Sequence, residues 1–148
     1  MAERDDVSRL NLTEETYIET IDALMRELGY AVVTDIAKRL AVKAPSVTSM
    51  LKRLDSLGFV KYTPYRNVSL TQKGQDLASF LKIRQKSLET FLGFLGVDEV
   101  FAEKDACAIE HVLGTPTLQK LSKFVAFLQT PEGAVMLEKF RKYQNNQV

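Results

Sequence analysis

Two short amphipathic segments joined by a tight turn constrain the fold of this chain more than any other feature. Apolar residues recur at helical spacing over residues 35–40 and again over 44–57, with a three-residue turn between the two runs. Gly58 ends the second run, and two short β-prone segments follow at 59–62 and 67–70. Helix, turn, helix and hairpin in this order predict a winged helix-turn-helix.

Helical periodicity also runs through the rest of the chain. A first helix is expected from a Thr13 cap to Leu28, with Gly29 ending it, and Thr34 is expected to cap the next helix. After the hairpin, Thr71 begins a long helical run. Shorter helical runs follow at 98–113, 117–128 and 131–143. We therefore expect a mainly α-helical protein with a small β-hairpin wing, with a winged helix-turn-helix domain over residues 1–73 and a helical domain over residues 74–148.

Charge is distributed unevenly along the chain. Residues 31–75 hold eight Lys or Arg and two Asp or Glu, a net charge of +6, whereas residues 1–30 carry −5. A basic segment between acidic and neutral ones is typical of a face that meets a polyanion, although a lysine-rich solvated surface has the same composition. The sequence has no apolar run of membrane-spanning length, and its N-terminus lacks the apolar segment of a secretory signal. We therefore expect a cytoplasmic protein that does not enter a membrane.

The second helix of the predicted helix-turn-helix is suited to contact DNA. Small and hydroxyl-bearing residues lie at its N-terminal end, which enters the major groove in such motifs, and basic residues follow one turn later, where phosphates would lie. A further arginine lies in the predicted wing. The candidate DNA-binding residues are Lys43, Pro45, Ser46, Thr48, Ser49, Lys52, Arg53 and Arg66. The expected partner is a double-stranded DNA operator.

A second group of chemically active residues lies in the helical half. Cys107, Glu110 and His111 are spaced i, i+3 and i+4, so one face of a helix carries all three. Thiolate, carboxylate and imidazole together suit a transition metal ion, whereas calcium or magnesium sites use oxygen ligands. The same residues also fit a structural role, with Cys107 in an apolar core and a Glu–His pair on the surface. Their position behind a DNA-binding half favours a sensor site.

Four stretches of this sequence resemble the diphtheria-toxin-repressor family of metal-dependent regulators. They lie at residues 15–21, 29–37, 46–48 and 105–112, the last being Asp-Ala-Cys-Ala-Ile-Glu-His-Val. The resemblance covers nearly the whole chain and is strongest to the short manganese-transport-regulator branch, which lacks a C-terminal SH3-like domain. It implies a winged helix-turn-helix followed by a helical metal-binding and dimerisation domain.

The resemblance carries metal ligands over unevenly. Cys107, Glu110 and His111 match the iron-responsive branch, while Glu19, Glu110 and His111 match the manganese branch. Thr16 stands where the iron branch has Met and the manganese branch has Asp, and Gln85 stands where the manganese branch has His. The implied site is therefore Glu19, Cys107, Glu110 and His111, with Thr16, Gln85 or water completing it. Because a thiolate disfavours manganese, the expected ion is Fe(II), followed by Mn(II).

A second metal site is less well supported by the sequence. Glu89 and Glu103 fall near ancillary-site positions of the iron branch, but Gln85 replaces the histidine expected there.

The resemblance implies a homodimeric repressor of metal-uptake genes that reads a palindromic operator. Two alternatives remain open from the residues alone. A winged-helix regulator could instead sense oxidation at Cys107 or bind a small molecule. An enzyme is disfavoured because the chain lacks a His-Glu-x-x-His motif, a nucleophile elbow and a glycine-rich phosphate loop.

Overall fold

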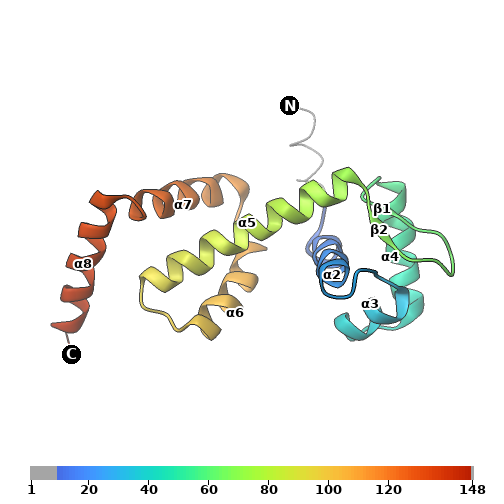
Figure 1. The fold of residues 1–148 in the computed structure, drawn as a ribbon, viewed down its shortest axis with the longest axis horizontal. Coiled ribbons are helices and arrows are strands. Elements are labelled where there is room, and N and C mark those ends of the chain that lie inside the picture. Colours follow the sequence, from blue (N-terminus) through green and yellow to red (C-terminus); the bar gives the residue numbers. More distant parts are fainter. Residues whose placement is uncertain (1–9, 148) are drawn as a thin grey trace. The chain divides into compact units, whose positions relative to one another are not determined.

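The structure is a computed structural model that describes residues 10–147 (Figure 1). The chain divides into two compact units, one ending at Lys82 and the next beginning at Ile83. The boundary falls inside the long helix α5 (Gln72–Phe94). Within the described residues, no helix is long and apolar enough to cross a membrane.

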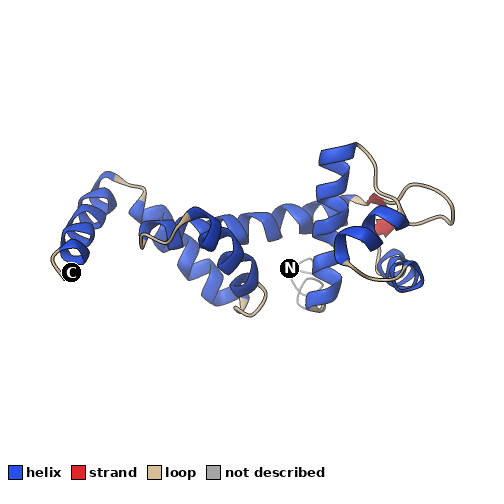
Figure 2. Ribbon diagram, turned by 90° about the horizontal axis from the view of Figure 1, so that it is seen from below, coloured by secondary structure: helices blue, strands red, loops and turns tan. Residues whose placement is uncertain are grey.

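The first unit has the order of elements expected for a winged helix-turn-helix. Helices α2 (Leu12–Leu28), α3 (Val33–Leu40) and α4 (Ala44–Ser56) precede strands β1 (Val60–Lys61) and β2 (Ser69–Leu70). The strands are antiparallel, with Val60 opposite Leu70, and Figure 2 shows them joined by the loop of the wing. This arrangement confirms the predicted mainly α-helical fold with a β-hairpin wing.

One apolar core holds the helices and the wing of this unit together. Most of the side chains with no exposed surface come from α2, α3, α4 and the wing. They include Ile18, Ile21, Ile36, Val47, Leu51, Leu54 and Val68. The backbone N–H of Val68 also donates to the carbonyl of Ala31 at 2.8 Å, which ties the wing to the segment between α2 and α3. Burying each of these aliphatic side chains contributes about 1.5–3 kcal/mol, so α4, the recognition helix of the helix-turn-helix, has a fixed orientation within this unit.

Two of the predicted helix caps were wrong. The N-cap of α2 is Asn11 rather than Thr13, and its side chain accepts from the backbone N–H of Glu14, whose carboxylate in turn accepts from the N–H of Asn11. This reciprocal capping box satisfies two helix-end donors, more than a single threonine hydroxyl could. Helix α3 begins at Val33 after Val32, so Thr34 lies inside it.

Two glycines shape the junction between the recognition helix, the wing and α5. Gly58 adopts φ +81°, a left-handed conformation that costs glycine little and lets the chain leave α4 and enter β1. Gly74, in the first turn of α5, lies so close to the wing that a Cβ atom would sit 2.1 Å from the carbonyl oxygen of Phe59. The start of α5 therefore packs directly on the backbone of the wing.

The second unit consists of the rest of α5 with α6 (Glu99–Glu110), α7 (Thr115–Leu128) and α8 (Pro131–Asn145). Its core is built on Leu88, Ala106 and Leu118. Helix α6 ends at Glu110, earlier than the predicted end at residue 113. Pro116, in the first turn of α7, has no N–H to continue a helix, so the chain turns before it and begins a new one.

Candidate DNA-binding surface and metal centre

Helix α4 has one buried face and one exposed face. Val47, Leu51 and Leu54 enter the core of the first unit. The predicted DNA-binding residues Lys43, Pro45, Ser46, Ser49 and Lys52 are exposed, and Thr48 is half-buried. The N-terminal turn of α4 thus presents small, hydroxyl and cationic side chains to solvent, as an element that enters a major groove must.

A concave surface joins this face of α4 to the wing. It is lined by Thr48 and Lys52 of α4, by the start of α3, and by Tyr62, Tyr65 and Arg66 of the wing. Tyr65 is fully exposed and has φ +62°, a conformation that is uncommon for a residue with a side chain. In this part of the wing the sequence pointed only to Arg66, so Tyr65 is an additional candidate contact.

Arg53 has a partner that the sequence did not indicate. Its Nε donates to Oε1 of Glu14, 39 residues away, and the Glu14 side chain is completely buried, whereas that of Arg53 is 58% exposed. The same carboxylate accepts from the N–H of Asn11 through Oε2 at 3.0 Å. Glu14 therefore caps α2 and anchors α4 at the same time.

A second ion pair joins α2 to α3. Arg39 donates to both oxygens of Glu27, at 3.2 and 2.6 Å. These hydrogen bonds, together with the positive charge of Arg39, lower the pKa of the Glu27 carboxyl. Because both side chains are exposed, the pair contributes little to stability.

The candidate metal residues of the second unit gather at the C-terminal end of α6. Glu110 is the last residue of α6 and its side chain is completely buried, and His111 caps the helix with a side chain that is 9% exposed. His111 Nε2 lies 3.3 Å from Glu110 Oε1. Arg84 of α5 donates from Nη2 to the backbone oxygen of Glu110 at 2.6 Å and is itself buried.

This pair of donors fits a divalent metal ion. An ion about 2.1 Å from both a carboxylate oxygen and an imidazole nitrogen would hold two donors 3.3 Å apart at an angle of about 100°, between octahedral and tetrahedral geometry. The Glu110 carboxylate is completely buried, and a buried carboxylate is stabilised by nearby cations, of which Arg84 is one.

The other predicted metal residues lie on α2, α5 and α6. Cys107 is exposed on α6, one turn before Glu110. Gln85 donates to Glu89 at 3.0 Å within α5. In the first unit, Glu19 is half-buried on α2, and the hydroxyl of Thr16 donates to the carbonyl of Leu12 at 2.8 Å.

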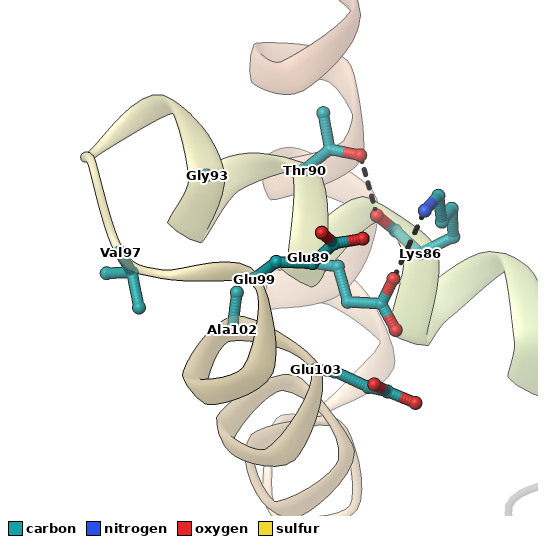
Figure 3. Close-up of a pocket in the computed structure, with 8 residues that line it drawn as sticks. All are labelled: Lys86, Glu89, Thr90, Gly93, Val97, Glu99, Ala102 and Glu103. Atoms are coloured by element: carbon teal, nitrogen blue, oxygen red, sulfur yellow. Dashed lines mark hydrogen bonds and ion pairs between the residues drawn. The ribbon is translucent and has the colours of Figure 1, made fainter.

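An acidic pocket lies between α5 and α6 in the second unit (Figure 3). Glu89, Glu99 and Glu103 line it, and Lys86 pairs with Glu89 at 3.2 Å. It contains the two glutamates that the sequence places near an ancillary site. The cluster by itself identifies no ligand.

Comparison with known proteins also divides the chain into a DNA-binding part and a metal-binding part. Residues 9–68 match the N-terminal DNA binding domain of the iron dependent repressors, and residues 71–136 match their metal binding and dimerisation domain. The HTH-type transcriptional regulator MntR of Bacillus pumilus is 40% identical over 129 residues, which cover 86% of this chain and 90% of the relative. The chain belongs to the iron-dependent repressor family.

Solved structures of this family share the fold. The IdeR crystal structure from T. acidophilum aligns with a TM-score of 0.65 at 27% identity, and the manganese regulator SloR with a TM-score of 0.63 at 29% identity. Each alignment covers 77% of this chain and 54% of the solved chain, so the protein spans about half the length of those two structures. The repressor family comprises DNA-binding transcriptional regulators that bind a divalent metal and dimerise, not enzymes, and this chain is one of them.

Proposed function

We propose that this protein represses metal-uptake genes when Mn(II) or Fe(II) occupies a site made by Glu19, Cys107, Glu110 and His111. The observation that carries the proposal is the buried Glu110 carboxylate beside His111, two metal-binding groups placed together at one helix end. The inclusion of Glu19 rests on the family resemblance of α2, and that of Cys107 rests on the spacing along α6. Thr16, Gln85 or water would complete the coordination.

The ion itself would act as a link between charged groups. Glu19 belongs to the DNA-binding unit, whereas the other three ligands belong to the second unit. An ion held by both would restrict their relative movement and favour the arrangements that bind DNA, which is a coupling between two binding events.

The choice between the two ions depends on Cys107. The relatives favour manganese, because SloR is described as a manganese regulator and the chain is similar to MntR proteins. A thiolate favours iron over manganese, because manganese prefers oxygen ligands. We infer that both ions activate the protein and that Cys107 raises the relative affinity for Fe(II). Cys107→Glu, which places the manganese-branch ligand there, should shift the preference toward Mn(II) in a paired titration with the two ions.

DNA recognition is assigned to α4 and the wing. The residues proposed to contact the operator are Lys43, Pro45, Ser46, Thr48, Ser49, Lys52, Arg53, Arg66 and Tyr65. Since the family dimerises through the second domain, two copies of α4 would read a palindromic operator on the chromosome, in the cytoplasm.

Alanine substitution at the proposed metal ligands tests this function. Glu110→Ala and His111→Ala should abolish the dependence of operator binding on Mn(II), measured by fluorescence anisotropy. Glu132→Ala is the matched control, because it removes an acidic side chain from the exposed surface of α8. If the two ligand variants still responded to Mn(II) as the wild type does, the proposed site would be wrong.

A further inference from the structure

The two oxygens of the buried Glu110 carboxylate face different side chains. Oε1 lies 3.3 Å from Nε2 of His111, and Oε2 lies 3.9 Å from Nε of Arg84. The side chain of Arg84 is 10% exposed and that of Glu110 is completely buried. One oxygen thus faces a metal-binding imidazole, and the other faces a guanidinium within the same unit.

This arrangement places a permanent positive charge beside a metal ligand. A guanidinium stays protonated at any physiological pH, and a buried carboxylate is stabilised by a nearby cation. A divalent ion that bound through Oε1 and His111 would therefore bring positive charge close to a positive charge already present. Arg84 favours the metal-free state of Glu110 over the metal-bound state.

We propose that Arg84 is a fixed counter-ion of Glu110 that stabilises the metal-free protein and weakens its affinity for metal. It thereby sets the metal concentration at which the regulator responds. This inference rests on the metal site proposed above. A purely mechanical role is the competing explanation, since Arg84 also joins α5 to the end of α6 through the backbone oxygens of Glu110 and Leu113, at 2.6 and 3.5 Å.

The two roles predict opposite changes in metal affinity. Arg84→Gln removes the charge but keeps an amide that can donate to a carbonyl. If Arg84 is a counter-ion, isothermal titration calorimetry should show a Kd for Mn(II) about tenfold lower than in the wild type. If Arg84 only holds the ligand in place, the Kd should rise, as it does when groups that orient metal ligands are removed. An unchanged or raised Kd would overturn the proposal.

Lys86→Gln provides the control for net charge. It removes one positive charge from the same helix, two residues further on, where Lys86 is exposed and pairs with Glu89. Its Kd for Mn(II) should stay within about twofold of the wild type, because exposed charges are screened by solvent and salt. A decrease as large as that of Arg84→Gln would show a general charge effect and refute the specific role of Arg84.

Thermal stability without metal tests the same pairing independently. Arg84→Gln should lower the Tm of the metal-free protein, and adding Glu110→Gln should recover part of that loss, because the buried charge is then gone. A double variant no more stable than the single one would contradict the counter-ion role. If the wild type failed to bind Mn(II), both the proposed function and the proposed effect of Arg84 on metal affinity would be overturned. If the wild type bound Mn(II) tightly but the double variant recovered none of the lost Tm, only the role of Arg84 would be overturned.

Discussion

The ion pair between Glu14 and Arg53 gives the sharpest test of how the DNA-binding unit is held together. The perturbation is Arg53→Ala, which leaves the completely buried Glu14 carboxylate without its contact from α4. A hydrogen bond to a charged group is worth about 1.5–3 kcal/mol, and breaking a buried pair costs about 3–5 kcal/mol. Because the Arg53 side chain is 58% exposed, water reaches it and the lower values apply. We expect Arg53→Ala to lower the free energy of unfolding by about 2–3 kcal/mol.

The partner substitution makes this expectation a double-mutant cycle. Glu14→Gln keeps an acceptor for the N–H of Asn11 but removes the buried charge, so it should cost only about 1–2 kcal/mol. With Glu14→Gln already present, Arg53→Ala should cost only about 1 kcal/mol instead of about 2–3, so the coupling is about 1–2 kcal/mol.

Urea unfolding followed by tyrosine fluorescence is suited to this measurement. Four of the five tyrosines, at positions 17, 30, 62 and 65, lie in the first unit and the chain has no tryptophan, so the signal reports mainly on that unit. Additive effects of the two substitutions, with no coupling, would refute the assigned role of Glu14 as the anchor of α4.

Three other predictions concern packing, pH and metal. Gly74→Ala should destabilise the protein by about 1–3 kcal/mol, because its Cβ would lie 2.1 Å from the carbonyl oxygen of Phe59. Gly93→Ala on the same helix is the control: its Cβ would meet nothing within 4 Å, so it should stabilise the protein by up to about 1 kcal/mol. Equal effects of the two substitutions in urea unfolding would show that the close contact at Gly74 does not exist. The Glu27 pKa, measured by NMR, should rise in Arg39→Ala, and an unchanged pKa would contradict the pairing. In the wild type, the pair's contribution to folding stability is fully present above the ordinary Glu pKa and is lost as the pH falls through the lowered pKa of Glu27. Adding Mn(II) at about 100 times its Kd should stabilise the native state by about 2.7 kcal/mol, seen as a raised Tm that a chelator reverses, and a Tm insensitive to Mn(II) would argue against a metal site.

Local patterns in the sequence predicted the elements of the first unit well. The apolar spacing over 35–40 and 44–57 corresponds to α3 and α4, and Gly58 marks the turn into the wing. These features depend on neighbours three or four residues apart, which periodicity records. Cap positions were less reliable because Asn11 and Thr13 are both good capping residues, and only the reciprocal bond to Glu14 decides between them.

Contacts between distant positions could not be read from the sequence. Glu14 and Arg53 are 39 residues apart, and Arg84 and Glu110 are 26 residues apart, so no spacing rule connects them. Arg53 was predicted to contact DNA because cations on a recognition helix usually meet phosphates, and no pattern in the sequence indicated its bond to Glu14. The pairing of Glu110 with His111 was easier to predict, because two adjacent residues whose side chains can both bind metal already suggest one shared metal ion.

DNA binding by this repressor is expected to depend on bound metal. The most direct measurement is fluorescence anisotropy with chelator-stripped protein and a labelled DNA fragment from its own upstream region, titrated anaerobically with Mn(II) and with Fe(II). We predict weak binding without metal and at least about tenfold tighter binding with either ion, reversed by chelator. Tight binding that ignored both ions would contradict metal control while leaving the DNA-binding unit as described.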